Sequence, residues 1–129
     1  MALIFNALAL FFAVLTAGIY WYGVEQSFFW IYDWYDSMLH VLGGITIGFW
    51  ASAVALRLQL PVRRAFFTVL GLTLLGAVAW EIFEYAFHFV RQEDYILDTL
   101  TDIMNGLAGC VLAFSGLWFV LLREKTHGE

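Results

Sequence analysis

Four apolar runs, each long enough to cross a lipid bilayer, constrain this sequence more than any other feature. They cover residues 3 to 23, 36 to 57, 64 to 90 and 98 to 122. A transmembrane helix needs about 20 mostly apolar residues, because each residue rises about 1.5 Å and the hydrocarbon core is about 30 Å thick. The mean hydropathy is +0.81 and only 13% of the residues are charged. We therefore predict an all-α integral membrane protein, a four-helix bundle with short loops in a single transmembrane domain over residues 1 to 129.

The charge balance argues against nucleic acid as a partner. The formal net charge is -5, and the chain has no basic tract that could neutralise a phosphate backbone. Cys110 is the only cysteine, so no intramolecular disulfide is possible. The N-terminal run has no positively charged start and stays apolar to Tyr22, which favours a retained first span over a cleaved leader.

The connections between the runs predict the orientation. Residues 24 to 35 are rich in aromatic side chains, which are typical of an interfacial segment at headgroup level. The second connection and the C-terminal tail are basic, with Arg57, Arg63, Arg64, Arg123 and Lys125. Cytoplasmic loops carry the excess of Lys and Arg, so we expect both termini in the cytoplasm and the aromatic segment outside.

Polar residues recur at one end of three runs, at the level that this orientation places near the outer leaflet. Their spacings of three, four and seven keep each set on one stripe of its helix, and a rise of about 1.5 Å per residue gives the sets similar depths. Small residues continue the stripes and predict close helix contacts at Gly43, Ala77 and Gly109. The polar residues are Asp36 and His40 in the second run, Glu81, Glu84 and His88 in the third, and Asp98, Asp102 and Asn105 in the fourth.

Five carboxylates at this level need compensation, because intramembrane charges are costly. Arg91 is the only basic side chain near this end and cannot neutralise them all. Carboxylates and imidazoles from several helices are ligands for zinc, manganese or iron, and all-oxygen sets suit magnesium or calcium. We therefore hypothesise a divalent metal site of unknown metal identity, with candidate ligands Asp36, His40, Glu81, Glu84, His88, Asp98 and Asp102.

Several of these residues also have simpler structural interpretations. Asp36 and Asp98 are equally suited to capping the N-terminal ends of their helices. His88 lies near the interface and suits an aromatic belt, Asn105 suits a bridge between helices, and Arg91 suits either an anionic lipid headgroup or a neighbouring carboxylate. The depth of Glu81 and Asp102 in the predicted bilayer favours a functional role for both.

Three segments resemble the VanZ-like and YjdF-like families of small bacterial membrane proteins. The segments are DSMLH, WEIFEY and DTLTDIMNGLAG, within residues 36 to 110. Ser37 stands where VanZ-like proteins usually have Lys and Glu84 where they usually have Gln, so the YjdF-like relation is closer. The resemblance implies a protein of the bacterial inner membrane linked to the cell envelope, and it supports a site without naming a reaction.

Two classes of function fit these observations, and the sequence does not decide whether the protein is an enzyme. The first is metal-assisted hydrolysis or transfer on an amphiphilic envelope substrate, with Glu81 or Glu84 as ligand or general base. The second is an accessory subunit that binds a haem or chlorin through His40 and His88, or docks onto a larger membrane complex. A relay of protons or cations is disfavoured because runs two and four carry no ionisable group between the acidic cluster and their cytoplasmic ends. Homo-oligomers remain open for a chain of this size.

Overall fold

The computed structural model of the protein describes residues 1–87 and 95–126, with side chains to residue 121. This part of the chain contains helices and no strand. The helices are α1 (Ala2–Glu25), α2 (Phe28–Ile31), α3 (Trp34–Arg57), α4 (Val62–Ala86) and α5 (Tyr95–Thr126). Four of them, α1, α3, α4 and the Tyr95–Leu121 part of α5, are long and apolar enough to cross a membrane. The predicted all-α membrane bundle is confirmed.

The helices extend beyond most of the predicted boundaries. α3 begins at Trp34, two residues before the predicted start of the second span. α5 runs from Tyr95 to Thr126 instead of residues 98 to 122. The hydrogen-bonded backbone continues past the apolar run because interfacial side chains such as Trp34 and Tyr95 are compatible with a helix. α4 is shorter than predicted, since its C-cap is Phe87. The predicted residues 88 to 90 lie outside the described part.

The aromatic segment forms the one-turn helix α2, held between two tight turns. Ser27 precedes it with a left-handed φ of 60°, and Tyr32 follows it in an extended conformation. The ring of Tyr35 lies 5.5 Å from that of Phe28 and 5.1 Å from that of Phe29. The Tyr35 hydroxyl also donates a 2.6 Å hydrogen bond to the carbonyl of Ile19. These contacts fix the start of α3 against the end of α1.

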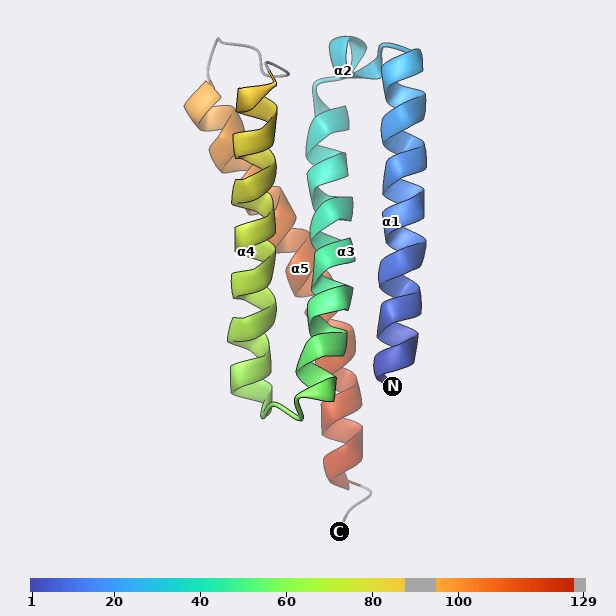
Figure 1. Ribbon diagram of the computed structural model, residues 1–129, viewed down its shortest axis with the longest axis vertical. Coiled ribbons are helices and arrows are strands. Elements are labelled where there is room, and N and C mark those ends of the chain that lie inside the picture. Colours follow the sequence, from blue (N-terminus) through green and yellow to red (C-terminus); the bar gives the residue numbers. More distant parts are fainter. Residues whose placement is uncertain (88–94, 127–129) are drawn as a thin grey trace.

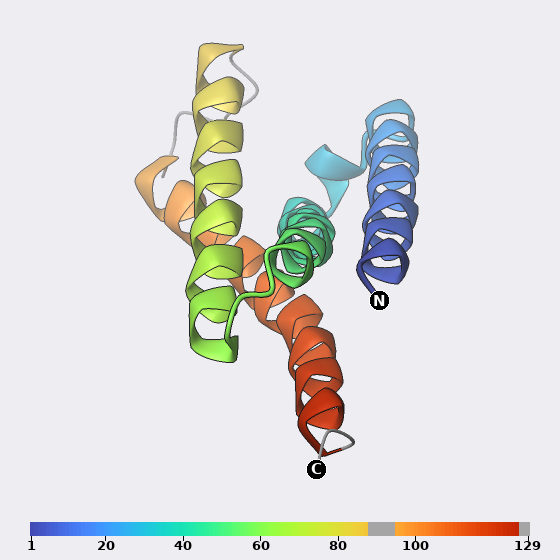
Figure 2. The same ribbon diagram turned by 60° about the horizontal axis from the view of Figure 1, so that its bottom comes forward.

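α3 is the central helix of the bundle. It packs against α1, α4 and α5, and α4 and α5 also pack against each other. In the described part of the chain the only long helix packed against α1 is α3, so α1 stands apart from α4 and α5 (Figure 2). The N-terminus, the α3–α4 connection and the C-terminal end of α5 lie at one end of the bundle, with α2 at the other (Figure 1).

The apolar core lies toward the α3–α4 connection, away from α2. Ala51 and Ala55 of α3 pack with Val69 of α4 and with Phe114 and Leu117 of α5, and all five are buried. Small alanines on α3 let the neighbouring helices approach this face closely. The other half of the bundle, where α3 begins and α4 ends, is left for polar side chains.

Candidate functional site

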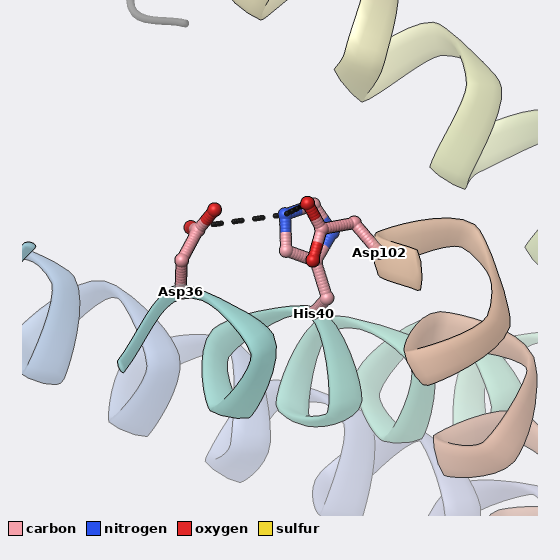
Figure 3. Close-up of side chains that lie close together, drawn as sticks. All are labelled: Asp36, His40 and Asp102. Carbon is pink, nitrogen blue, oxygen red and sulfur yellow. Dashed lines mark ion pairs between the residues drawn. The ribbon is translucent and has the colours of Figure 1, made fainter. Parts of the chain in front are cut away.

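His40 lies at the centre of a cluster of carboxylates near the α2 end of the bundle. Its Nε2 atom is 3.8 Å from Oδ1 of Asp36, one turn earlier on α3, and 3.7 Å from Oδ2 of Asp102 on α5 (Figure 3). Its Nδ1 atom is 3.8 Å from Oε1 of Glu81 on α4. One imidazole therefore faces carboxylates from three helices, as the helical spacings predict.

Two of these carboxylates are almost completely buried. Glu81 is 5% exposed and Asp102 is 3% exposed, and His40 itself is 9% exposed. Oε1 of Glu81 has no hydrogen-bond partner among the described residues. An unpartnered carboxylate oxygen in a low-dielectric interior is costly, so this atom marks a place where a proton or a cation would be stabilised.

Glycines bring α3 and α5 close enough for the cluster to form. A Cβ atom added at Gly44 would collide with the carbonyl oxygen of Gly106, and one added at Gly109 would collide with that of Val41. His40 is one turn before Gly44, and Asp102 is one turn before Gly106. A close approach of the two helices therefore lies one turn from the His40–Asp102 pair.

The cluster offers two groups of metal-capable ligand atoms that share the imidazole. One consists of Asp36, His40 and Asp102, and the other of His40, Glu81 and Glu84, with the ligand atoms of each group within 4.8 Å of one another. Carboxylate oxygens and an imidazole nitrogen suit zinc, manganese or iron. Five of the predicted site residues are thus brought together.

The other predicted site residues have different positions. Asp98 lies exposed in the first turn of α5 and is in neither ligand group. Asn105 is half-buried on α5 and is likewise in neither group. His88 and Arg91 lie outside the described residues.

The simpler interpretation of Asp36 as a helix cap is wrong, because α3 already begins at Trp34 with Asp33 as its N-cap. Asp98 is no cap either, since α5 begins at Tyr95.

A groove of about 410 Å³ leads away from the cluster, and sequence reasoning missed it. Its floor is α3, and its walls come from α1 on one side and α4 on the other, with Gly106 of α5 at the base. Asp36, His40 and Glu84 form its polar end. The groove exists because α1 packs against α3 without reaching α4. A volume of this size is typical of small-molecule sites, which span about 300–1,000 Å³.

One glycine expected at a helix contact lies in this groove instead. Nothing lies within 4 Å of a Cβ atom built at Gly43, whereas Gly44 beside it is the residue that contacts α5. The expectation for Gly43 is therefore wrong, because the face of α3 that contacts α5 continues from His40 through Gly44 and Gly48, whereas the expectation for Gly109 is confirmed by its contact with Val41. The adjacent glycines in the sequence could have indicated both features: Gly44 permits the helix contact, and Gly43 leaves space for the groove.

Comparison with known proteins places the chain in a family. Residues 1–123 match the family model described as predicted membrane protein (DUF2238). The chain belongs to this family. The match covers all four spanning helices up to residue 123, including every residue of the His40 cluster. No curated protein and no solved structure matches the chain.

Proposed function

We propose that the cluster binds one divalent metal ion between α3 and α5, held by Asp36, His40 and Asp102. The observation that supports this most strongly is a single buried imidazole 3.7–3.8 Å from three carboxylates of three helices. Each intramembrane carboxylate costs about 2.5–3.5 kcal/mol on insertion scales, and the cost must be offset locally. Arg57, Arg63 and Arg64 lie at the opposite end of the bundle, near the α3–α4 connection.

The distances suit an ion after small side-chain movements. Zinc lies about 2.0–2.2 Å from nitrogen and oxygen ligands, so two ligands in tetrahedral geometry stand about 3.4 Å apart, and never more than about 4.3 Å. The Nε2 atom of His40 is 3.8 Å and 3.7 Å from the oxygens of Asp36 and Asp102. These separations exceed a hydrogen bond and fall within the range that one shared ion can span.

The other imidazole nitrogen supports this assignment. A metal-bound histidine normally donates its second N–H to a carboxylate, which fixes the ring and raises the basicity of the ligating nitrogen. Glu81 stands in that position, with its unpartnered Oε1 3.8 Å from Nδ1 of His40. In this arrangement Asp36, His40 and Asp102 bind the ion, and Glu81 orients the imidazole.

Glu84 is the best candidate for a general base in a metal-assisted hydrolysis or transfer. It lines the groove, whereas Glu81 is buried and does not. The ion would polarise a substrate oxygen or activate water, and Glu84 would accept the proton at the polar end of the groove. The substrate is then an amphiphile that enters from the bilayer, because the groove lies between spanning helices.

The alternative of a haem or chlorin subunit is less well supported. Both ring nitrogens of His40 are already directed toward carboxylates, and a macrocycle site does not require so many acids. His88, the second axial ligand in that hypothesis, lies outside the described residues.

The cellular setting forms part of the same proposal. The VanZ-like and YjdF-like resemblance and the basic α3–α4 connection support the bacterial inner membrane, with both termini cytoplasmic and the cluster near the outer leaflet. The N-terminus and the C-terminal end of α5 lie at the end of the bundle that carries this connection (Figure 1). Membrane lipids are the proposed partners, with no role for nucleic acid.

Metal content measures the proposal directly. The purified protein, loaded separately with Zn²⁺ and Mn²⁺ and then desalted, is expected to retain one ion per chain. Asp102→Asn removes one ligand with little change in shape and should abolish retention, whereas Asp33→Asn, outside the cluster, should retain the ion. Equal retention by the two variants, or no retention by the wild type with either metal, would refute the site.

A further inference from the structure

The groove has the length of one leaflet of a bilayer. Along α3 it extends from Asp36 to Ile47, and along α4 from Glu84 to Thr73. Each stretch corresponds to about 16 Å at a rise of about 1.5 Å per residue. Half of a hydrocarbon core about 30 Å thick has almost the same depth. The polar end of the groove is thus at headgroup level when its apolar end reaches the middle of the membrane.

The wall of the groove is apolar although three threonines line it. The hydroxyls of Thr16, Thr46 and Thr73 each donate a hydrogen bond of 2.7–2.9 Å to a carbonyl one turn earlier in the same helix. Their donors are therefore used, and the remaining surface below the carboxylates consists mainly of alanine, glycine and aliphatic side chains. A bound water needs about 2–4 polar partners, so hydrocarbon fits this wall better than water.

The negative charges of the cluster indicate which kind of headgroup a bound amphiphile would carry. Asp36, Glu81, Glu84 and Asp102 carry four negative charges when ionised, and one divalent ion leaves an excess of two. An anionic head would increase this excess, and a purely cationic head would leave the ion without an oxygen from the ligand. A zwitterionic head supplies a phosphate oxygen for the ion and an ammonium group for the excess negative charge of the cluster.

We propose that the groove binds one acyl chain of a zwitterionic aminophospholipid from the leaflet on the α2 side, with its head at the His40 cluster. The position of the phosphate rests on the proposed metal ion. The position of the chain rests on the groove alone. Trp80 and Tyr20 line the two walls and contact the chain from opposite sides.

Gly43 provides a selective way to block the groove. It lies on the floor, and a Cβ atom added there meets no atom within 4 Å, so the side chain of Gly43→Leu starts in open space and extends into the groove. Gly116 on α5 is the matched control, because it is exposed, outside the groove and equally free of neighbours. Both variants add the same leucine to a spanning helix.

The experiment measures phospholipid retained after detergent exchange, by mass spectrometry of the intact complex. The protein is first reconstituted in vesicles of equal parts phosphatidylethanolamine and phosphatidylglycerol. The wild type and Gly116→Leu should each retain one phosphatidylethanolamine, and Gly43→Leu should retain none. Retention by Gly43→Leu at the wild-type level, or a preference for phosphatidylglycerol, would overturn the proposal, as would a wild type without bound lipid.

Metal content of the same samples separates this result from the proposed function. Gly43→Leu leaves the ligands in place and should hold its ion while it loses the lipid. Asp102→Asn should lose the ion and the preference between the two heads, and still retain a chain. Lipid loss without metal loss therefore tests the groove, and metal loss without chain loss tests the site.

Discussion

Replacing Gly44 with alanine tests whether the packing of α3 against α5 sets the geometry of the metal site. The added Cβ would stand 2.6 Å from the carbonyl carbon of Gly106 and 2.9 Å from its Cα. Backbone cannot move aside as a flexible side chain can, so the two helices must separate. Restoring ordinary contact at 3.4 Å requires a shift of at least about 0.8 Å, the difference from 2.6 Å, because the carbonyl oxygen of Gly106 is nearer still.

The same shift reaches the ligands one turn away. The 3.7 Å between Nε2 of His40 and Oδ2 of Asp102 would grow to at least about 4.5 Å when the helices separate along this line. One ion with ligand bonds of about 2.0–2.2 Å cannot join atoms more than about 4.3 Å apart. Losing a ligand weakens binding more than losing an outer hydrogen-bond partner, which costs about 10–100-fold. We therefore expect Gly44→Ala to bind Zn²⁺ at least about tenfold more weakly than the wild type.

Gly43→Ala is the control, because it places the same methyl group on the adjacent residue in open space. Both variants gain the same helix propensity, about 1 kcal/mol, so their difference isolates the helix contact. Overpacking costs about 1–3 kcal/mol, and Gly44→Ala should be less stable in detergent than Gly43→Ala by that amount. Titration against a chelating dye gives the affinity. Equal Zn²⁺ affinity for the two variants would show that the helix contact does not control the ligands.

Three further predictions concern other parts of the molecule. Tyr35→Phe removes the hydrogen bond to Ile19 that joins α3 to α1, and should lower the free energy of unfolding in detergent by about 0.5–1.5 kcal/mol; unchanged thermal stability would contradict this role. Glu81→Gln should weaken metal binding by about 10–100-fold without abolishing it, and a complete loss would make Glu81 a ligand instead. With the native cysteine replaced by alanine, Ser27→Cys should react with an impermeant maleimide on intact bacteria and Gln59→Cys should not; the reverse labelling would invert the predicted orientation.

The sequence predicted the level of the site because helical geometry is local. A fixed rise and rotation per residue place Asp36 and His40 on one stripe, and do the same for Glu81 and Glu84. Consecutive spans cross the bilayer in opposite directions, so the start of the second run, the end of the third and the start of the fourth lie at the same end of the bundle. No tertiary contact was needed for either inference.

Which faces are buried could not be predicted in the same way. The most apolar window lies in α1, with a mean hydropathy of 2.3, yet only 11% of it is buried, against 44% for α3 with a mean hydropathy of 1.7. Lipid tails are as apolar as a protein core, so hydropathy does not distinguish a lipid-facing side chain from a packed one. The exposure of α1 and the groove beside it follow from packing alone.

The sequence by itself determined four spanning helices and the gathering of acids at one end, because insertion into a bilayer depends on the length and polarity of each segment. Only the tertiary structure decided that His40 lies between Asp36, Asp102 and Glu81 while Asp98 stays exposed. The rotation of each helix about its own axis determines which of these side chains face the bundle interior. It is set by close backbone contacts such as Gly44 against Gly106, which no single segment encodes.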